Sequence, residues 1–275
     1  MAESPLPVQP RPSASLVIGR DGPAGWEIFM ARRHNDTAFA GGALVFPGGA
    51  LEAGDETGAV GEAGAGDETA AVGEAGAVDW LHAHRLAAIR ETFEEVGILY
   101  ARHADGTWPA AALLATLGEA RAALAGGQIA FAELLARHGL RPALDALTPF
   151  AHWITPPERP KRFDTRFFLA ALPPGQDGVH DGGELVDSFW APPDRVVALG
   201  MTGACLVMRA TEVNCRRLAG YASCAEAIAD FRAHPHTLVT PSYFAAGGIR
   251  YFSVPARGGR GVLTLPAKVA SPTPS

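Results

Sequence analysis

The chain has 275 residues, 48% of them hydrophobic, and a formal net charge of −6 at pH 7. This length is enough for one large domain, or for a domain with a helical appendage. The acidic balance and the lack of a long basic block exclude a non-specific nucleic-acid binder, which needs a clustered positive surface. No window approaches the roughly 18 apolar residues of a membrane-spanning helix, so no membrane partner is expected.

The cysteines and the first residues indicate the compartment. Cys205, Cys215 and Cys224 lie in one late segment without CxxC spacing. An odd number of cysteines with no paired framework is typical of a reducing compartment and gives no sign of structural zinc. Residues 1–13 are rich in proline and lack the apolar core of a signal peptide. We therefore expect a cytoplasmic protein with a disordered lead over residues 1–13.

The apolar patterning predicts strands and helices in mixed order. Strands are expected at residues 14–18, 26–31, 43–46, 150–154, 165–171 and 188–190. Helices are expected at residues 79–96, 110–125 and 129–138 and over most of 192–232. The first two strands flank a DGPAG turn and predict a hairpin. Because strands and helices mix without strict βαβ alternation, the sequence predicts a mixed-sheet α/β or α+β domain.

A tandem repeat interrupts the chain before the first long helix. GDETGAVGEAGA at residues 54–65 is followed by GDETAAVGEAGA at residues 66–77, and the copies differ only at Gly58 and Ala70. Two copies are too few for a solenoid, and neither has an apolar face to stack. Closing a longer loop costs only about 0.6 kcal/mol per doubling of its length. Residues 54–78 are therefore expected to form a flexible surface insertion.

Three glutamates share one face of the helix expected at residues 79–96. Glu91, Glu94 and Glu95 have the spacing i, i+3, i+4, and Gly97 follows as an expected helix end. Neighbouring like charges at these spacings repel by about 0.2–0.5 kcal/mol per pair. A divalent cation would relieve this repulsion, and hard oxygen ligands suit Mg²⁺ or Mn²⁺. The plain alternative is a solvated acidic helix face.

Together with the upstream Phe46-Pro-Gly-Gly49, the stretch Arg90–Gly97 resembles the Nudix box. In that motif a glycine after a strand is followed by five residues, Glu, seven residues, and Arg-Glu-apolar-x-Glu-Glu-x-Gly. Thr92 takes the place of the apolar residue. Counting from Gly49 places Asp55 where the motif has its first glutamate, and counting back from Arg90 places His82 there. That glutamate is therefore absent or replaced.

An insertion at this point resembles the long insertion inside the Nudix box of one branch of the superfamily, the coenzyme A diphosphatase-like proteins. FMARRH at residues 29–34 stands at the distance from FPGG where that branch carries an arginine-containing signature, although Ala38 replaces its second arginine. Later stretches resemble the branch up to about residue 200. The resemblance implies a Nudix-type mixed β-sheet sandwiched between helices over residues 14–200, with a helical C-terminal extension over residues 201–275.

The resemblance also implies a reaction: hydrolysis of a diphosphate that links a nucleoside to another group. Coenzyme A or acyl-coenzyme A is the first expected substrate, and NADH, ADP-ribose or a nucleotide sugar is the alternative. A second alternative is a non-catalytic module that binds a nucleotide, which the missing first glutamate favours. By position in the motif, Glu91, Glu94 and Glu95 bind Mg²⁺ or Mn²⁺, and Arg90 orients a ligand carboxylate. Acidic residues of the repeats, such as Asp55, are an alternative source of ligands, but a flexible loop holds a cation poorly.

Substrate contacts are expected from residues around the box. Gly48 and Gly49 let the backbone approach the site. Arg32 or Arg33 pairs with a substrate phosphate, because arginine suits phosphate oxygens, and a basic strand edge is the alternative.

Three further residues are candidates farther along the chain. Arg162 and Phe163 are expected to line the pocket, with Phe163 stacking on a base, and a core phenylalanine beside a surface ion pair is the alternative. Glu184 is the candidate general base outside the box, against the alternative of a surface glutamate before a strand. A homodimer is left open.

Overall fold

The computed structural model describes residues 8–22, 25–37, 40–58, 80–234, 238–239, 241–246, 249–255 and 262–266. The strands are β1 (Arg11–Gly22), β2 (Gly25–Arg33), β3 (Ala43–Val45), β4 (Gly48–Ala50), β5 (Ala101–His103), β6 (Leu140–Pro142), β7 (Thr148–Ile154), β8 (Phe163–Ala171), β9 (Leu185–Ala191), β10 (Leu206–Val207), β11 (Leu238–Val239), β12 (Ser242–Ala246), β13 (Ile249–Pro255) and β14 (Val262–Pro266). The helices are α1 (Ala53–Gly58), α2 (Trp80–Val96), α3 (Ala111–Glu119), α4 (Arg121–Ala125), α5 (Phe131–Arg137), the 3₁₀ turn η1 (Leu144–Ala146), α6 (Pro193–Met201), α7 (Arg209–Leu218) and α8 (Cys224–Ala233).

The main sheet is mixed, as the sequence predicts. Its order is β10-β3-β2-β1-β8-β7-β11, with β4 paired to β1 and β9 paired to β2. β1 runs parallel to β8, from Arg11 opposite Phe163 to Gly19 opposite Ala171. The expected hairpin is confirmed, because β1 and β2 pair antiparallel up to Gly22 opposite Gly25.

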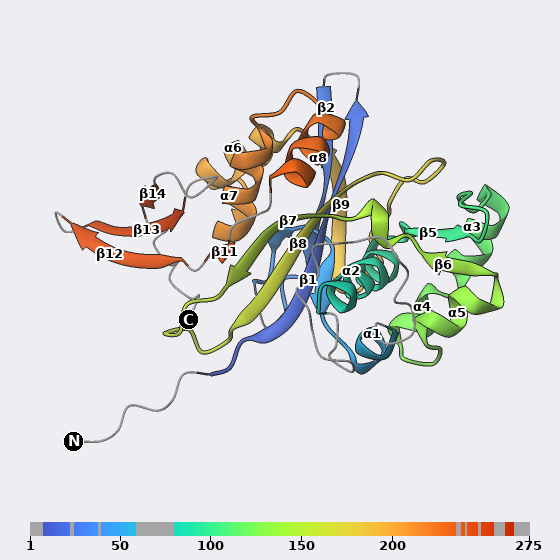
Figure 1. The fold of residues 1–275 in the computed structure, drawn as a ribbon. Helices are drawn as coiled ribbons and strands as arrows, with labels where there is room; N and C mark the ends of the chain where they lie inside the picture. The colour runs from blue at the N-terminus through green and yellow to red at the C-terminus, as the bar shows by residue number, and fades with distance from the viewer. Residues whose placement is uncertain are drawn as a thin grey trace.

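Helices cover both faces of this sheet (Figure 1). On one face, Leu16 and Ile18 of β1 and Phe168 of β8 pack in a core shared with α2 and α3–α5. On the other face, Val17 of β1 packs in a second core with residues of α6, α7 and α8. Successive residues of a strand point to opposite faces, so a strand buried on both sides reads as a continuous apolar run. The expected sheet between helices is confirmed.

The beginning of the chain differs from the expected disordered lead over residues 1–13. Arg11–Ser13 already belong to β1, and residues 1–7 lie outside the described part. The Arg11 amide donates to the carbonyl of Arg162 at 2.9 Å, and the Ser13 and Thr165 hydroxyls lie 2.7 Å apart. These bonds extend the ladder into a proline-rich stretch whose composition alone suggested no structure.

The insertion is described only at its start. Ala53–Gly58 form α1, so residues 54–58 of the expected flexible segment are helical, while residues 59–79 lie outside the described residues. α1 contacts α2, which places the first turn of the repeat against the rest of the domain.

The C-terminal extension is helical only in its first half. After α7 and α8 the described residues form β11, which joins the main sheet, and the antiparallel sheet β12-β13-β14. The segments SYFAA, IRYFSVP and VLTLP are rich in β-branched and aromatic residues, which favour strands over helices. Within the part of the chain that the structure describes, no helix has the length and apolar character needed to cross a membrane.

Candidate active site

Two glycines of β4 bring its backbone against α2 and β1. A Cβ on Gly49 would lie 2.4 Å from Glu91 Oε1, and a Cβ on Gly48 would lie 2.3 Å from the carbonyl oxygen of Ala14. Gly48 also has φ 152°. No larger residue fits at either position without displacing a neighbour. The expected close approach of the backbone therefore occurs, and its partner is the glutamate face of α2.

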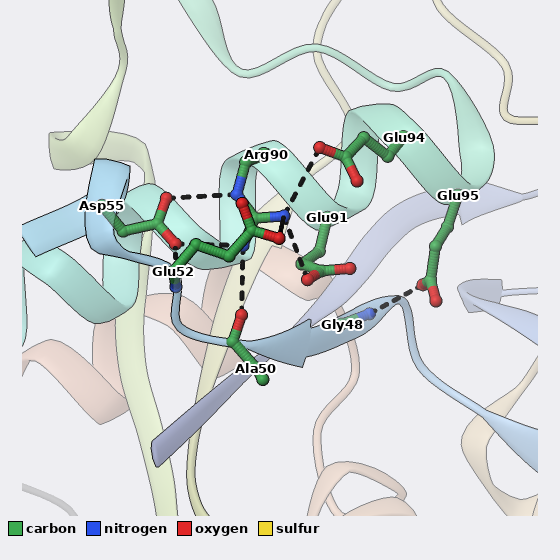
Figure 2. Close-up of polar contacts among 8 residues, drawn as sticks. All are labelled: Gly48, Ala50, Glu52, Asp55, Arg90, Glu91, Glu94 and Glu95. Carbon is green, nitrogen blue, oxygen red and sulfur yellow. Dashed lines mark hydrogen bonds and ion pairs between the residues drawn. The ribbon is translucent and has the colours of Figure 1, made fainter. Parts of the chain in front are cut away.

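Arg90 is the centre of the hydrogen-bond network on α2 (Figure 2). Its Nη1 donates to Glu91 Oε1 at 3.1 Å and to Glu94 Oε1 at 3.4 Å, and its Nη2 donates to the Ala50 carbonyl at 3.1 Å. Burial alone would lower the pKa of Arg90, but Asp55, Glu91 and Glu94 together raise it above its ordinary value. Arg90 is therefore a fixed positive charge that joins the turn after β4 to the helix.

Asp55 supplies the carboxylate at the position of the missing first glutamate. Its Oδ1 accepts from Arg90 Nε at 3.2 Å, and its Oδ2 accepts from Arg90 Nη2 at 3.0 Å. Oδ2 also accepts from the Glu52 amide at 2.9 Å. Both oxygens of Asp55 are thus engaged, which weighs against its use as a metal ligand. The count from Gly49 found this residue, but the sequence did not reveal its partner.

The three glutamates of α2 are neighbouring like charges, of which Glu95 is buried and Glu91 and Glu94 are half-buried. Glu95 accepts from the Gly48 amide at 2.8 Å, and its burial raises its pKa well above the ordinary value, with Glu91 and Glu184 adding to the effect. Burial raises the pKa of Glu91 to about 7; Arg90 opposes the rise, and Glu94 and Glu184 reinforce it. Burial also raises the pKa of Glu94. Each carboxylate would be stabilised in its ionised form by a cation.

The donor set fits a hard divalent cation, since carboxylate oxygens are the ligands that Mg²⁺ and Mn²⁺ prefer. In the described residues, however, no three acidic, histidine or cysteine side chains converge on one point that could hold a metal ion. Arg90 draws Glu91 and Glu94 toward itself, while Glu95 points to the Gly48 amide. Joint ligation by the three glutamates therefore requires side-chain rotations of Glu91 and Glu94 away from Arg90.

Arg32 and Arg33 point to opposite faces of β2, as neighbouring residues of a strand do. Arg33 forms an ion pair with Glu184, and its charge lowers the pKa of Glu95. Arg32 Nε lies 3.7 Å from Asp187 Oδ2, and its Nη2 donates to Cys205 Sγ at 3.8 Å. Of the two predicted phosphate partners, the structure brings Arg33 to the glutamate face and Arg32 to the opposite one.

Glu184 lies at the edge of the glutamate cluster. Its charge helps to raise the pKa of both Glu91 and Glu95. Asp181 orders the turn before it by accepting the amides of Gly183, Glu184 and Leu185 at 3.1, 2.9 and 2.9 Å. The candidate base therefore stands on an ordered turn beside the site.

Arg162 and Phe163 form hydrogen bonds away from the glutamate face. Arg162 Nε donates to the Thr155 carbonyl at 3.0 Å, and its Nη1 donates to the Val8 carbonyl at 2.6 Å. The Phe163 amide donates to Thr155 Oγ1 at 3.1 Å. These contacts join the β7–β8 connection to the N-terminal segment, and none of them reaches the glutamate face. A pocket role for the two residues stays a prediction.

A mixed sheet between helices, with a glycine-rich turn packed on an Arg-Glu-x-x-Glu-Glu helix, defines the Nudix hydrolase class. The model of the NUDT19 Nudix domain matches residues 66–205, half of the chain, and the chain belongs to this family. The match starts inside the repeat segment and includes all of α2.

Two relatives agree with this assignment. The acyl-coenzyme A diphosphatase NUDT19 of Gallus gallus is 30% identical over 215 residues, which cover 64% of this chain and 56% of that protein. The chain thus spans a little over half the length of its curated relative. The crystal structure of a NUDIX hydrolase from Alicyclobacillus acidocaldarius is similar with a TM-score of 0.68 and 28% identity, covering 81% of this chain and 96% of that one. The predicted superfamily and its coenzyme A diphosphatase-like branch are confirmed.

Proposed function

We propose that this protein is a metal-dependent diphosphatase that cleaves the diphosphate of coenzyme A or of an acyl-coenzyme A. The observation that carries the proposal is the partly buried carboxylate cluster of α2, held against a glycine-rich strand with Arg33 and Glu184 at its edge. The choice of substrate is supported by the family and by the printed activity of the chicken relative.

Each residue has a proposed part in the reaction. Glu91, Glu94 and Glu95 would hold Mg²⁺ or Mn²⁺, which when bound shields phosphate oxygens and activates water. Arg90 bonds to Glu91 and Glu94, and both carboxylates would turn from it toward the cation.

The substrate contacts are proposed at the edge of this cluster. Arg33 would exchange its partner Glu184 for a phosphate oxygen, since both are anionic oxygen acceptors. Glu184 is then the candidate to take a proton from the attacking water. Gly48 and Gly49 let the β4 backbone lie directly against Ala14 and Glu91, beside the proposed diphosphate site.

The alternative of a non-catalytic nucleotide-binding module is now weaker. It depended on the absence of the motif's first glutamate, and Asp55 provides a carboxylate that pairs with Arg90 from that position. A cytoplasmic location is part of the proposal and is supported by three unpaired cysteines, Cys205, Cys215 and Cys224. A homodimer stays a prediction.

The test is product analysis by mass spectrometry with Mg²⁺ or Mn²⁺. The substrates are coenzyme A, an acyl-coenzyme A, NADH, ADP-ribose and a nucleotide sugar. The inactive control is Glu94→Gln/Glu95→Gln, and the matched surface control is Glu133→Gln, whose carboxylate is exposed on α5. We expect 4′-phosphopantetheine and adenosine 3′,5′-bisphosphate, or the acyl equivalent, from the wild type and the surface control only.

The other outcomes decide between the alternatives. Cleavage of NADH, ADP-ribose or the nucleotide sugar in place of coenzyme A would keep the chemistry and reject the substrate. No cleavage of any of the five would reject the diphosphatase and favour the binding module.

A further inference from the structure

Three separate parts of the chain complete the C-terminal end of α2, the helix that carries the glutamates. The last carbonyls of a helix have no partners within the helix itself. The Gly97 amide donates to the Phe93 carbonyl at 2.9 Å, and the Val179 amide donates to the Val96 carbonyl at 2.9 Å. The Glu94 carbonyl accepts from Arg121 Nη2 at 3.1 Å. The end of the helix is therefore fixed by residues from α4 and from the segment before β9.

Arg121 joins these two parts to each other. The same Nη2 that contacts Glu94 also donates to the Val179 carbonyl at 3.3 Å. A Cβ on Gly97 would lie 2.9 Å from Arg121 Nη1, so the guanidinium sits directly over the helix end. A cation at this place also interacts favourably with the negative end of the helix dipole.

The segment that Arg121 grips leads directly to Glu184. Gln176 is fixed on both sides, since its Oε1 accepts the Leu99 amide at 2.7 Å and its Nε2 donates to the Leu99 carbonyl at 2.9 Å. After Val179, Asp181 orders the turn that ends in Glu184. Burial lowers the pKa of Arg121, and the nearby charge of Asp181 opposes this decrease. A continuous set of bonds thus runs from the end of α2 to the turn that presents Glu184.

We propose that Arg121 is a positioning residue that sets the distance between Glu184 and the glutamates of α2. It touches none of the reacting groups and acts through the backbone of Glu94 and Val179. The proposal rests on the proposed function, because it assigns Glu184 a part in the reaction. It adds that the helical segment α3–α5, which the Nudix box does not include, controls the geometry of the site.

The first experiment is a double-mutant cycle in which Arg121→Met and Glu184→Gln are combined. Misplacement of a catalytic group by about 1 Å can cost on the order of a hundredfold in rate. We therefore expect Arg121→Met to lower kcat by roughly tenfold to a hundredfold with a small change in KM. In the Glu184→Gln background the same substitution should change kcat by less than about twofold, because the group that it positions is already gone.

The second experiment tests whether Arg121 holds the turn, and it does not depend on enzymatic activity. In hydrogen–deuterium exchange, the Arg121→Met variant should exchange faster than the wild type at the amides of Val179, Glu184 and Leu185. The matched control is Arg232→Met, which removes a similar clamp of α8 on the Thr148 hydroxyl and the Asp145 carbonyl, at 3.1 and 3.0 Å. This control should show normal exchange at those amides and no coupling to Glu184→Gln.

Two results would overturn the proposal. One is unchanged exchange at residues 179–185 in Arg121→Met protein that is folded. The other is a double variant whose loss of kcat equals the product of the losses in the two single variants. That result is expected if Arg121→Met destabilises the protein generally and does not act through Glu184. If the wild type cleaves no diphosphate, the proposed function fails, and the exchange experiment still decides whether Arg121 holds the turn.

Discussion

Asp55 binds the guanidinium of Arg90 with both carboxylate oxygens, and each side chain is only 5% exposed. The two residues are 35 positions apart, and all of the repeat insertion after its first two residues lies between them. Asp55, at the start of the insertion, therefore joins the two halves of the motif. Asp55 reaches Arg90 from α1 with a side chain one methylene shorter than the glutamate of the motif.

Loss of this pair should destabilise the protein. Removing one partner of a buried ion pair leaves the other charge uncompensated, at a cost of about 3 kcal/mol. We expect this loss for Asp55→Ala in urea unfolding of metal-free protein. The matched control is Asp145→Ala, which removes an exposed partner of Arg102 and should cost less than about 1 kcal/mol. Equal losses in the two variants would show that Asp55 is no more than a surface charge.

Deletion of the second repeat should have little effect. Because Asp55 and α1 precede residues 66–77, removal of those residues leaves the pair with Arg90 in place. Shortening the connection changes the closure free energy by less than about 0.6 kcal/mol. We expect kcat and KM within about twofold of the wild type. A large loss of kcat in folded protein would assign the repeat a part in catalysis.

The metal-free protein should lose stability as the pH rises. Burial raises the pKa of Glu91 from 4.5 to about 7, so the folded state binds the proton more tightly than the unfolded state. The resulting stability is present below pH 4.5 and is lost as the pH rises to about 7, on the order of 3 kcal/mol for this one group. Thermal unfolding in chelator at several pH values measures the slope. Glu91→Gln should flatten it, and Mn²⁺ should restore stability at high pH in the wild type.

His84 should produce the opposite slope in a lower range. Its side chain belongs to the first half of α2 and is buried, and this burial lowers its pKa below 6.5, with the nearby charge of Arg166 adding to the effect. The unfolded state then binds the proton more tightly, so stability falls as the pH drops below 6.5. We expect His84→Leu to reduce this acid sensitivity, measured by urea unfolding between pH 7 and 5. An unchanged slope, equal to that of the control His138→Leu, would argue against this role.

Arg32 and Arg33 provide a matched pair of substitutions. Only Arg33 lies on the glutamate face, so Arg33→Gln should raise KM for the diphosphate substrate by roughly tenfold, the equivalent of one lost charge-assisted contact. Arg32→Gln should leave KM within about twofold. Steady-state kinetics on the two variants measures both. A larger rise in KM for Arg32→Gln than for Arg33→Gln would contradict the prediction, because it would place the substrate on the face of β2 opposite the glutamates.

Much of the fold could be predicted from local patterns. The apolar runs of β1 and β2 and the helical periodicity of α2 depend on neighbours in sequence, and the structure follows them. The two halves of the motif meet, since Arg90 donates to the Ala50 carbonyl and Glu95 accepts from the Gly48 amide. Strand alternation predicts that Arg32 and Arg33 face opposite sides, but which side holds the glutamates depends on where α2 packs.

The missed features depend on contacts between distant segments. Asp55 could be counted from Gly49, yet its pairing with Arg90 requires α1 to pack against α2. Arg121 carries no sequence signal, because its partners are backbone carbonyls, which every residue has. In the described residues, β12–β14 pair only with one another. In the sequence, only their β-branched and aromatic residues indicated strands, and the rest of the tail was also compatible with helices.

The parallel pairing of β1 with β8 has a consequence for how the protein is made. β1 is the first strand, and its parallel neighbour β8 is not complete until Ala171. Pairing of strands so far apart in sequence is slow, because the loop between them must close before contacts reward it. A nascent chain that has left the ribosome up to residue 160 already contains the whole Nudix box and still lacks β8, the parallel partner of β1. The motif is synthesised early, and the sheet on which it packs can be completed only late.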